Sequence, residues 1–229
     1  SHADLDKVEQ STLEALVTDF READGTLTYG DLIIEADKNI GDIILANTNN
    51  NYHGKTIVES GKLLADGNNT LGSTSDLILK EGTEAENIGA QTIGQVTVKE
   101  EATAMLTDVE IGASFVERNG NEYGVLAEGE NAIADITNST IETSSIGAHG
   151  VYALDGGHVG YSGGSVTTSG AGAHGLLADN SPNSIIADGT DVTTSADDAD
   201  GARARNGGRI FLSSNEINTA GANAHGLVV

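Results

Sequence analysis

The sequence predicts an all-β fold, a parallel β-helix with three short strands in each coil and a capping helix at its N-terminus. Three observations predict it: glycines that recur about every 25 residues, apolar positions with the same period, and an early stretch with helical spacing. A fixed period of this length is typical of a stacked solenoid rather than of a globule with one central core. The repeating glycines are Gly124, Gly150, Gly175, Gly201 and Gly226.

The first predicted strand of each coil begins at this glycine. The residue one position later is apolar in every coil, and the residue three positions later is alanine in the first four, while the residue between them varies. Apolar positions that flank a variable one are the period-2 pattern of a strand with one buried face. The alanines indicate an interior position where a larger side chain would overpack. They are Ala127, Ala153, Ala178 and Ala204.

Two further apolar positions recur with the same period and predict the second and third strands. The second strand is marked by Ile133, Val159, Ile185 and Ile210, and the third by Ile141, Val166, Val192 and Ile217. β-Branched residues favour strands, and the Gly, Asn, Asp and Ser between these positions supply turns. Helical repeats are excluded because Gly, Thr, Ser and Asn are too frequent for helices of the length such repeats need.

The upstream half is less regular but predicts the same architecture. Short β-rich runs, such as residues 32–34 and 77–79, are separated by Gly and Asn clusters. We therefore expect one continuous solenoid over residues 25–229, with about 25 residues in each coil. The regular coils occupy residues 122–229.

The first 24 residues differ from the rest. Apolar residues recur at helical spacing over residues 4–22, among good helix formers. We expect one amphipathic helix that covers the open end of the solenoid, because such an end exposes a core and unpaired strands. A partner-binding helix is the alternative. Ser1 and His2 resemble the remnant of an expression tag. The tag remnant and the predicted helix together make residues 1–24 a separate N-terminal region.

Composition limits the partners. The net charge is −24, and residues 119–202 contain no Lys or Arg. Such a surface repels phosphate backbones, so nucleic acid is excluded as a partner. The absence of cysteine removes disulfide scaffolds and thiol chemistry. No apolar run approaches the length of a membrane-spanning helix.

Residues 52–63 carry a resemblance to a known family. The pattern Tyr52-x-Gly54-x-Thr56, followed by Gly61-x-Leu63, resembles the passenger-associated transport repeat of Gram-negative autotransporters. The transport-type repeat lies near residues 47–80, and the later Gly-Ala-His-Gly segments are similar to pertactin-type passenger coils. The resemblance implies a right-handed β-helix that is exported through a C-terminal outer-membrane β-barrel. It implies a location at the bacterial cell surface, in the outer membrane, or outside the cell after passenger release.

The resemblance also implies a class of function. Passengers of this type are mostly adhesins or aggregation factors, so we expect binding to host matrix or cell-surface protein or glycan, or self-association and biofilm formation. The alternatives are a structural spacer that displays a distal domain and a β-helix enzyme that degrades polysaccharides. We expect no enzyme, catalytic residue or cofactor, because no Gly-x-Ser-x-Gly motif is present and aromatic residues are few.

Two columns of residues are the candidate partner-binding sites. The residue before each repeating glycine gives Tyr123, His149, His174, Asp200 and His225, and the second residue after it gives Leu126, Tyr152, Leu177, Arg203 and Val228. We expect the second column to be an outward, mostly apolar stripe that contacts a partner. Isolated surface apolar residues are the alternative.

The first column has two alternatives to partner binding. One is a polar turn ladder that hydrogen-bonds to itself, and the other is a zinc ion held by His174, Asp200 and His225. We expect no metal there. We also expect Asp197 and Asp198, next to Asp200, to form a solvated acidic loop rather than a calcium site, because the glycine-rich nonapeptide of calcium-binding β-rolls is absent.

Overall fold

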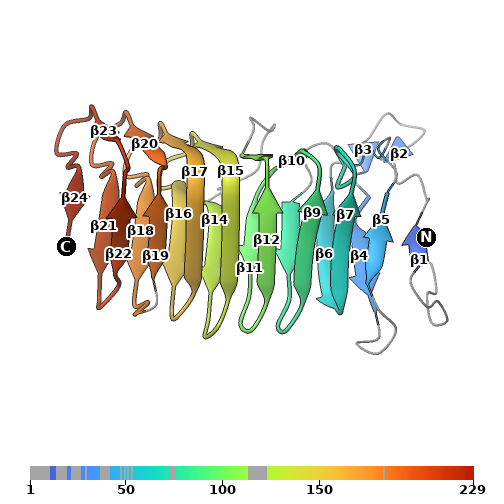
Figure 1. The fold of residues 1–229 in the computed structure, drawn as a ribbon. Helices are drawn as coiled ribbons and strands as arrows, with labels where there is room; N and C mark the ends of the chain where they lie inside the picture. The colour runs from blue at the N-terminus through green and yellow to red at the C-terminus, as the bar shows by residue number, and fades with distance from the viewer. Residues whose placement is uncertain are drawn as a thin grey trace.

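A computed structural model places most of the chain in an all-β parallel solenoid of about seven turns, with no helix in the part it describes (Figure 1). The residues that it describes are 11–13, 20–21, 27–28, 30–36, 42–46, 48, 50, 52, 54–72, 76–112, 123–182 and 184–229. The strands lie across the solenoid axis, and successive coils stack along it (Figure 1).

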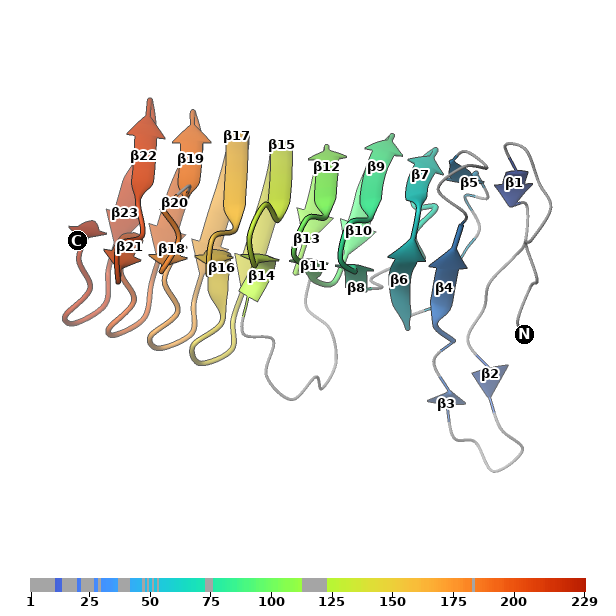
Figure 2. The ribbon, with the colours of Figure 1, turned by 90° about the horizontal axis from the view of Figure 1, so that it is seen from below.

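Two long parallel sheets form the main faces of the solenoid, and Figure 2 shows them from below as two facing rows of strands. In chain order the nine-stranded sheet comprises β4 (Leu32–Glu35), β6 (Lys55–Ser60), β8 (Asp76–Leu79), β11 (Val96–Val98), β14 (Tyr123–Glu128), β16 (His149–Leu154), β18 (Leu176–Asp179), β21 (Ala202–Arg205) and β24 (Leu227–Val228). Each of these strands pairs with its counterpart in the next coil.

The thirteen-stranded sheet lies opposite. Its main path comprises β1 (Ser11–Leu13), β5 (Ile43–Leu45), β7 (Lys62–Asp66), β9 (Glu84–Ile88), β12 (Thr103–Thr107), β15 (Ile133–Thr143), β17 (His158–Thr168), β19 (Ile185–Asp188) and β22 (Ile210–Ser213). Off this path are β10 (Gln91–Ile93), β13 (Val109–Ile111), β20 (Asp191–Thr194) and β23 (Ile217–Thr219). A separate antiparallel pair joins β2 (Phe20–Arg21) to β3 (Leu27–Thr28).

The pairing register confirms most of the predicted repeat. The apolar position after each glycine is in register from coil to coil, in the column Val125, Val151, Leu176, Ala202 and Leu227. The alanine column is also in register, and its members are buried. The third apolar position is in register as well, in the column Ile141, Val166, Val192 and Ile217.

The prediction for the second apolar position is wrong in one coil. Ala134, not Ile133, pairs with Val159, and Ile133 pairs with His158. Ala134 is buried in the core, whereas Ile133 is only half-buried. Because successive side chains of a strand point to opposite faces, a slip of one residue exchanges the core face for the outer face. The larger side chain of the two is therefore not the one that faces the core.

The upstream coils are shorter than the period of the later ones predicts. Leu32 pairs with Thr56, Thr56 with Leu77 and Leu77 with Val96, so the coil length decreases along this part of the chain. The next coil, from Val96 to its partner Val125, is longer again. Strand pairing fixes only the spacing between rungs, so the turns absorb these differences in coil length.

The structure describes only residues 11–13 and 20–21 of the predicted N-terminal helix, and it shows no helix there. Ser11–Leu13 is strand β1, which pairs in parallel with β5, and Phe20–Arg21 is strand β2. An exposed sheet edge presents unpaired N–H and C=O groups, and here a strand satisfies them by adding a rung. The other residues of this segment lie outside the described part of the chain.

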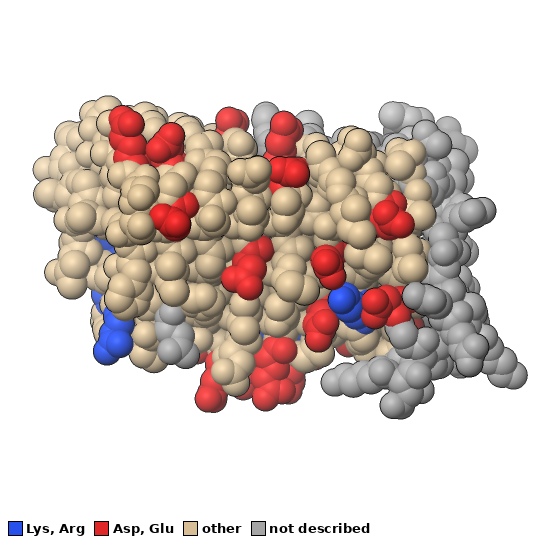
Figure 3. Space-filling model, viewed as in Figure 1, with Lys and Arg blue, Asp and Glu red and all other residues tan. Residues whose placement is uncertain are grey.

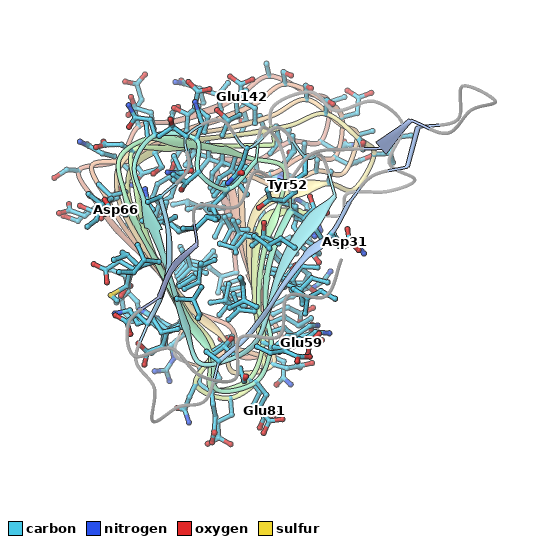
Figure 4. The ribbon with its side chains drawn as sticks, turned by 90° about the vertical axis from the view of Figure 1, so that its right-hand side faces the viewer. Asp31, Tyr52, Glu59, Asp66, Glu81 and Glu142 are labelled. Atoms are coloured by element: carbon cyan, nitrogen blue, oxygen red, sulfur yellow. The ribbon has the colours of Figure 1, made fainter. Side chains whose placement is uncertain are left out.

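The core fills a wedge between the two long sheets. Viewed along the axis, the sheets converge toward the turn that carries Glu81, and the wide end is closed near Glu142 (Figure 4). The repeating glycines pack against this wide end. A Cβ atom at Gly150 would lie 2.2 Å from Cγ1 of Val166 and 2.7 Å from the carbonyl oxygen of Gly175. Only glycine fits such a position, which explains the period seen in the sequence.

Candidate contact faces of the solenoid

Four of the five residues before the repeating glycines form a hydrogen-bonded ladder at the edge of the nine-stranded sheet, whereas the hydroxyl of the fifth, Tyr123, lies 3.2 Å from Oγ1 of Thr97. The backbone N–H of His174 donates to Nδ1 of His149 (3.1 Å), and the backbone N–H of Asp200 donates to Nδ1 of His174 (3.0 Å). The backbone N–H of His225 donates to Oδ1 of Asp200 (3.0 Å). Each side chain therefore accepts a hydrogen bond from the backbone of the next coil, as in the predicted polar turn ladder.

The two histidine rings of this ladder are in contact. The rings of His149 and His174 stack with their centroids 5.0 Å apart and their planes 6° apart. Tyr152 meets the His149 ring edge-on, with centroids 5.5 Å apart. His149 is half-buried and His174 is 7% exposed, so little of the stacked pair is open to solvent, whereas the His225 side chain is 64% exposed.

Asp200 is the buried charge of the ladder, since its side chain is 2% exposed. Its carboxylate accepts a hydrogen bond from Nη1 of Arg203 (3.0 Å) and lies 3.0 Å from Nδ1 of His225. Burial alone would raise the pKa of Asp200, but the hydrogen bonds from His225, the nearby His174 and Arg203 together lower it. Asp200 is therefore fully engaged by protein groups.

Asp179 is the centre of a second charged cluster on the same sheet. Arg205 contacts Oδ2 of Asp179 through both Nε and Nη2 at 2.7 Å, and Nδ2 of Asn206 donates to Oδ1 at 2.7 Å. Burial opposes ionisation, but these hydrogen bonds and the Arg205 charge lower the pKa of Asp179. Since Arg203 also binds a carboxylate, that of Asp200, the charges of both arginines on β21 are paired with buried or half-buried acidic groups.

The outward stripe is less exposed than predicted. Leu177 is fully buried and Leu126 is 5% exposed, so the two leucines do not face water. Tyr152, Arg203 and Val228 are half-buried. Leu177 lies in register between Tyr152 and Arg203, and these longer side chains flank it. The expectation of an apolar stripe open to solvent is therefore wrong at the two leucines.

The acidic turn also serves the next coil. Oδ1 of Asp197 accepts the backbone N–H of Ala222 (2.8 Å), and Oδ1 of Asp198 accepts Nδ2 of Asn223 (3.2 Å). Within the described ranges, no three His, Cys, Asp or Glu side chains are grouped so that they could hold a metal ion. The carboxylates of this turn therefore satisfy polar groups of the following coil.

The transport-type motif has a packing role. Tyr52 is fully buried and its hydroxyl lies 2.6 Å from Oγ1 of Thr56 (Figure 4). A Cβ atom at Gly72 would come within 2.7 Å of the Tyr52 ring, and one at Gly54 would lie 2.2 Å from the carbonyl oxygen of Gly30. The motif residues thus close one coil tightly against its neighbours.

Half of the exposed large apolar side chains in the described part of the chain lie on the outer face of the thirteen-stranded sheet. This outer face carries Ile88, Met105, Ile186 and Phe211, which are 38–55% exposed. Ile186 and Phe211 are adjacent in register. Acidic side chains are scattered over the same face, and basic ones are few (Figure 3).

A shallow recess lies on this outer face beside Ile186. It has a volume of about 380 Å³, and its floor at Gly160 and Ser162 is low because these residues have small side chains. Asp135 and Asp188 flank it. The sequence contains a signal for this face, since Ile186 and Phe211 directly follow the second apolar positions Ile185 and Ile210 and lie one period apart.

Searches against protein-family models, curated proteins and solved structures found no significant match to this chain. The described part of the chain contains no long apolar helix of the kind that crosses a membrane. The resemblance to autotransporter passengers therefore rests on the sequence motifs, alongside a fold that is compatible with them.

Proposed function

We propose that the chain is a fragment of an autotransporter passenger, a right-handed, three-stranded β-helix that acts in adhesion or self-association. Its partner would be a host matrix or cell-surface protein or glycan, or an identical passenger. The full-length protein would be exported through an outer-membrane β-barrel, and the fragment would act at the cell surface or after release. The motif at residues 52–63 and the solenoid architecture support this assignment.

The observation that carries the proposal is a pair of exposed apolar side chains, Ile186 and Phe211, which are adjacent in register on the outer face of the thirteen-stranded sheet. In the described part of the chain, eight large apolar side chains are exposed, and four of them lie on this one face. Contiguous exposed apolar area is typical of contact sites. Ile186 and Phe211 lie on successive rungs, about 4.8 Å apart, so the two side chains can contact one partner together.

The contact face is testable by substitution. The double change Ile186→Asp and Phe211→Asp should weaken adhesion or self-association of the purified chain by about tenfold or more, because apolar anchors dominate contact energy. Binding to immobilised matrix proteins, glycans and the chain itself provides the measurement. Ile33→Asp is the matched control, since Ile33 is 47% exposed on the opposite sheet. Unchanged binding by the double variant, or an equal loss in the control, would refute the assignment of this face.

A spacer role is the second candidate. The nine-stranded sheet runs without interruption from β4 to β24, which suits a rod that holds another domain away from a surface. The spacer predicts that the isolated chain neither binds nor aggregates. It also predicts that adhesion by the full-length protein survives removal of these coils.

A further inference from the structure

We propose that the stacked imidazoles of His149 and His174 make the packing of the C-terminal coils dependent on pH, so that acidification loosens this part of the solenoid. This inference does not depend on the proposed adhesive function. It starts from the two hydrogen bonds in which Nδ1 of each ring accepts a backbone N–H of the following coil.

A nitrogen that accepts a hydrogen bond cannot carry a proton. Nδ1 of His149 accepts from the backbone of His174, and Nδ1 of His174 accepts from the backbone of Asp200. The hydrogen bonds therefore assign both rings to the neutral form with the proton on Nε2. Protonation would place an N–H opposite an N–H at both rungs, and each backbone donor would lose its acceptor.

Stacking adds a second penalty. The ring centroids of His149 and His174 are 5.0 Å apart, and the planes are 6° from parallel. Two protonated rings would place like charges face to face at this separation, in a site largely closed to water. The interaction between two such charges is strong where water is excluded.

The arginines among the charged neighbours also oppose protonation of the two rings, and one carboxylate is the exception. The groups that face the two rings are Tyr123 on β14, Tyr152 on β16, Asp179 on β18, Arg203 and Arg205 on β21, and Asp200 and His225 in the turns before β21 and β24. Asp200 is the exception, since its Oδ2 lies 3.6 Å from Nδ1 of His174. However, Arg203 and His225 already bind the Asp200 carboxylate, and Arg205 binds Asp179.

The pKa shifts agree with this geometry. Burial, followed by the charges of His174 and Arg205, lowers the pKa of His149 from 6.5 to about 4. Burial also lowers the pKa of His174, and burial and the two arginines together outweigh the opposing effect of Asp200. Because both pKa values are lower in the folded chain, the unfolded chain binds more protons as the pH falls below 6.5. The free energy of unfolding therefore decreases from about pH 6.5 to about pH 4.

Two carboxylates contribute in a separate range. The pKa values of Asp179 and Asp200 are lowered from 3.8, so the stability that they provide is lost only as the pH falls below that value. The loss of stability that the two histidines cause therefore begins at a higher pH than the loss that these two carboxylates cause. At pH 5, the shift of His149 alone corresponds to an increase of about 20-fold in the unfolding equilibrium constant relative to pH 7.

The test compares urea unfolding of the purified chain from pH 7.5 to pH 4.5 with that of the double variant His149→Asn and His174→Asn. The Asn side chain offers an oxygen in place of Nδ1 and does not titrate. The unfolding equilibrium constant of the wild-type chain should increase as the pH falls over this range. In the double variant this increase should be at least tenfold smaller. His158→Asn, on the opposite sheet, is the control and should retain the wild-type pH dependence. Equal pH dependence in the wild type and the double variant would overturn the proposal.

A second measurement covers the case in which the double variant fails to fold. The imidazole resonances of the wild-type chain can be followed by NMR as a function of pH. An apparent pKa of His149 well below 6.5 supports the proposal. A value at or above 6.5 overturns it, since the ring would then titrate as freely as in the unfolded chain.

Discussion

Replacing Leu177 with alanine should lower the free energy of unfolding by about 2–5 kcal/mol, the usual cost of truncating a buried leucine. Leu177 is on the outer side of the nine-stranded sheet, yet its side chain is completely inaccessible to water. Its removal would leave a cavity between Tyr152 and Arg203, the neighbours in register. Urea unfolding monitored by circular dichroism provides the measurement.

Ile186→Ala is the matched control for this change. Ile186 is also on the outer side of a sheet, but it is 48% exposed. Its truncation should change stability by no more than about 0.5 kcal/mol, as is usual for surface positions. If both variants were destabilised equally, the distinction between a covered face and an open face would be wrong. The prediction that Leu177 belongs to an exposed contact stripe would then stand.

Replacing Gly175 with alanine should lower the free energy of unfolding by about 1–3 kcal/mol, the typical cost of overpacking. A Cβ atom there would lie 2.3 Å from Cγ1 of Val192 and 2.6 Å from the carbonyl oxygen of Gly201. The backbone of the next coil is held by strand pairing, so it cannot easily move away. The midpoint of urea unfolding should fall without a change in the slope of the transition.

The last glycine of the same column provides the control. A Cβ atom at Gly226 would meet no atom within 4 Å. Gly226→Ala should therefore be neutral or stabilising by up to about 1 kcal/mol, through the unfolded chain. A similar loss of stability in both variants would mean that the conformational freedom of glycine, rather than close stacking of coils, explains the period.

The repeat was predictable because stacking constrains equivalent positions in every coil. The columns that begin at Val125 and Ile141 each combine burial with register, so their residues change little from coil to coil. The polar ladder was also predictable as one of the alternatives. Side chains that recur before the closely packed glycines lie one above another, so they can accept hydrogen bonds from the backbone of the next coil.

Other features depend on contacts that a repeat pattern does not contain. Leu177 is buried by side chains on neighbouring rungs, and no feature within its own coil signals this. The slip at Ile133 arose because two apolar residues, Ile133 and Ala134, are adjacent and only one can face the core. The lengths of the upstream coils were missed because no residue there recurs at a fixed interval. The strand at Ser11–Leu13 depends on the edge presented by β5.

The most direct test of the central claim is a set of distances between spin labels in one outer column. Thr107, Thr137, Ser162, Asp188 and Ser213 are in register on successive rungs. The chain has no cysteine, so Thr107→Cys can be combined with Asp188→Cys or Ser213→Cys to place two labels. For three and four rungs, electron double resonance should give separations of about 14 Å and about 19 Å. Separations that do not increase between the two pairs, or a broad distribution beyond about 30 Å, would contradict a stack of parallel coils in register.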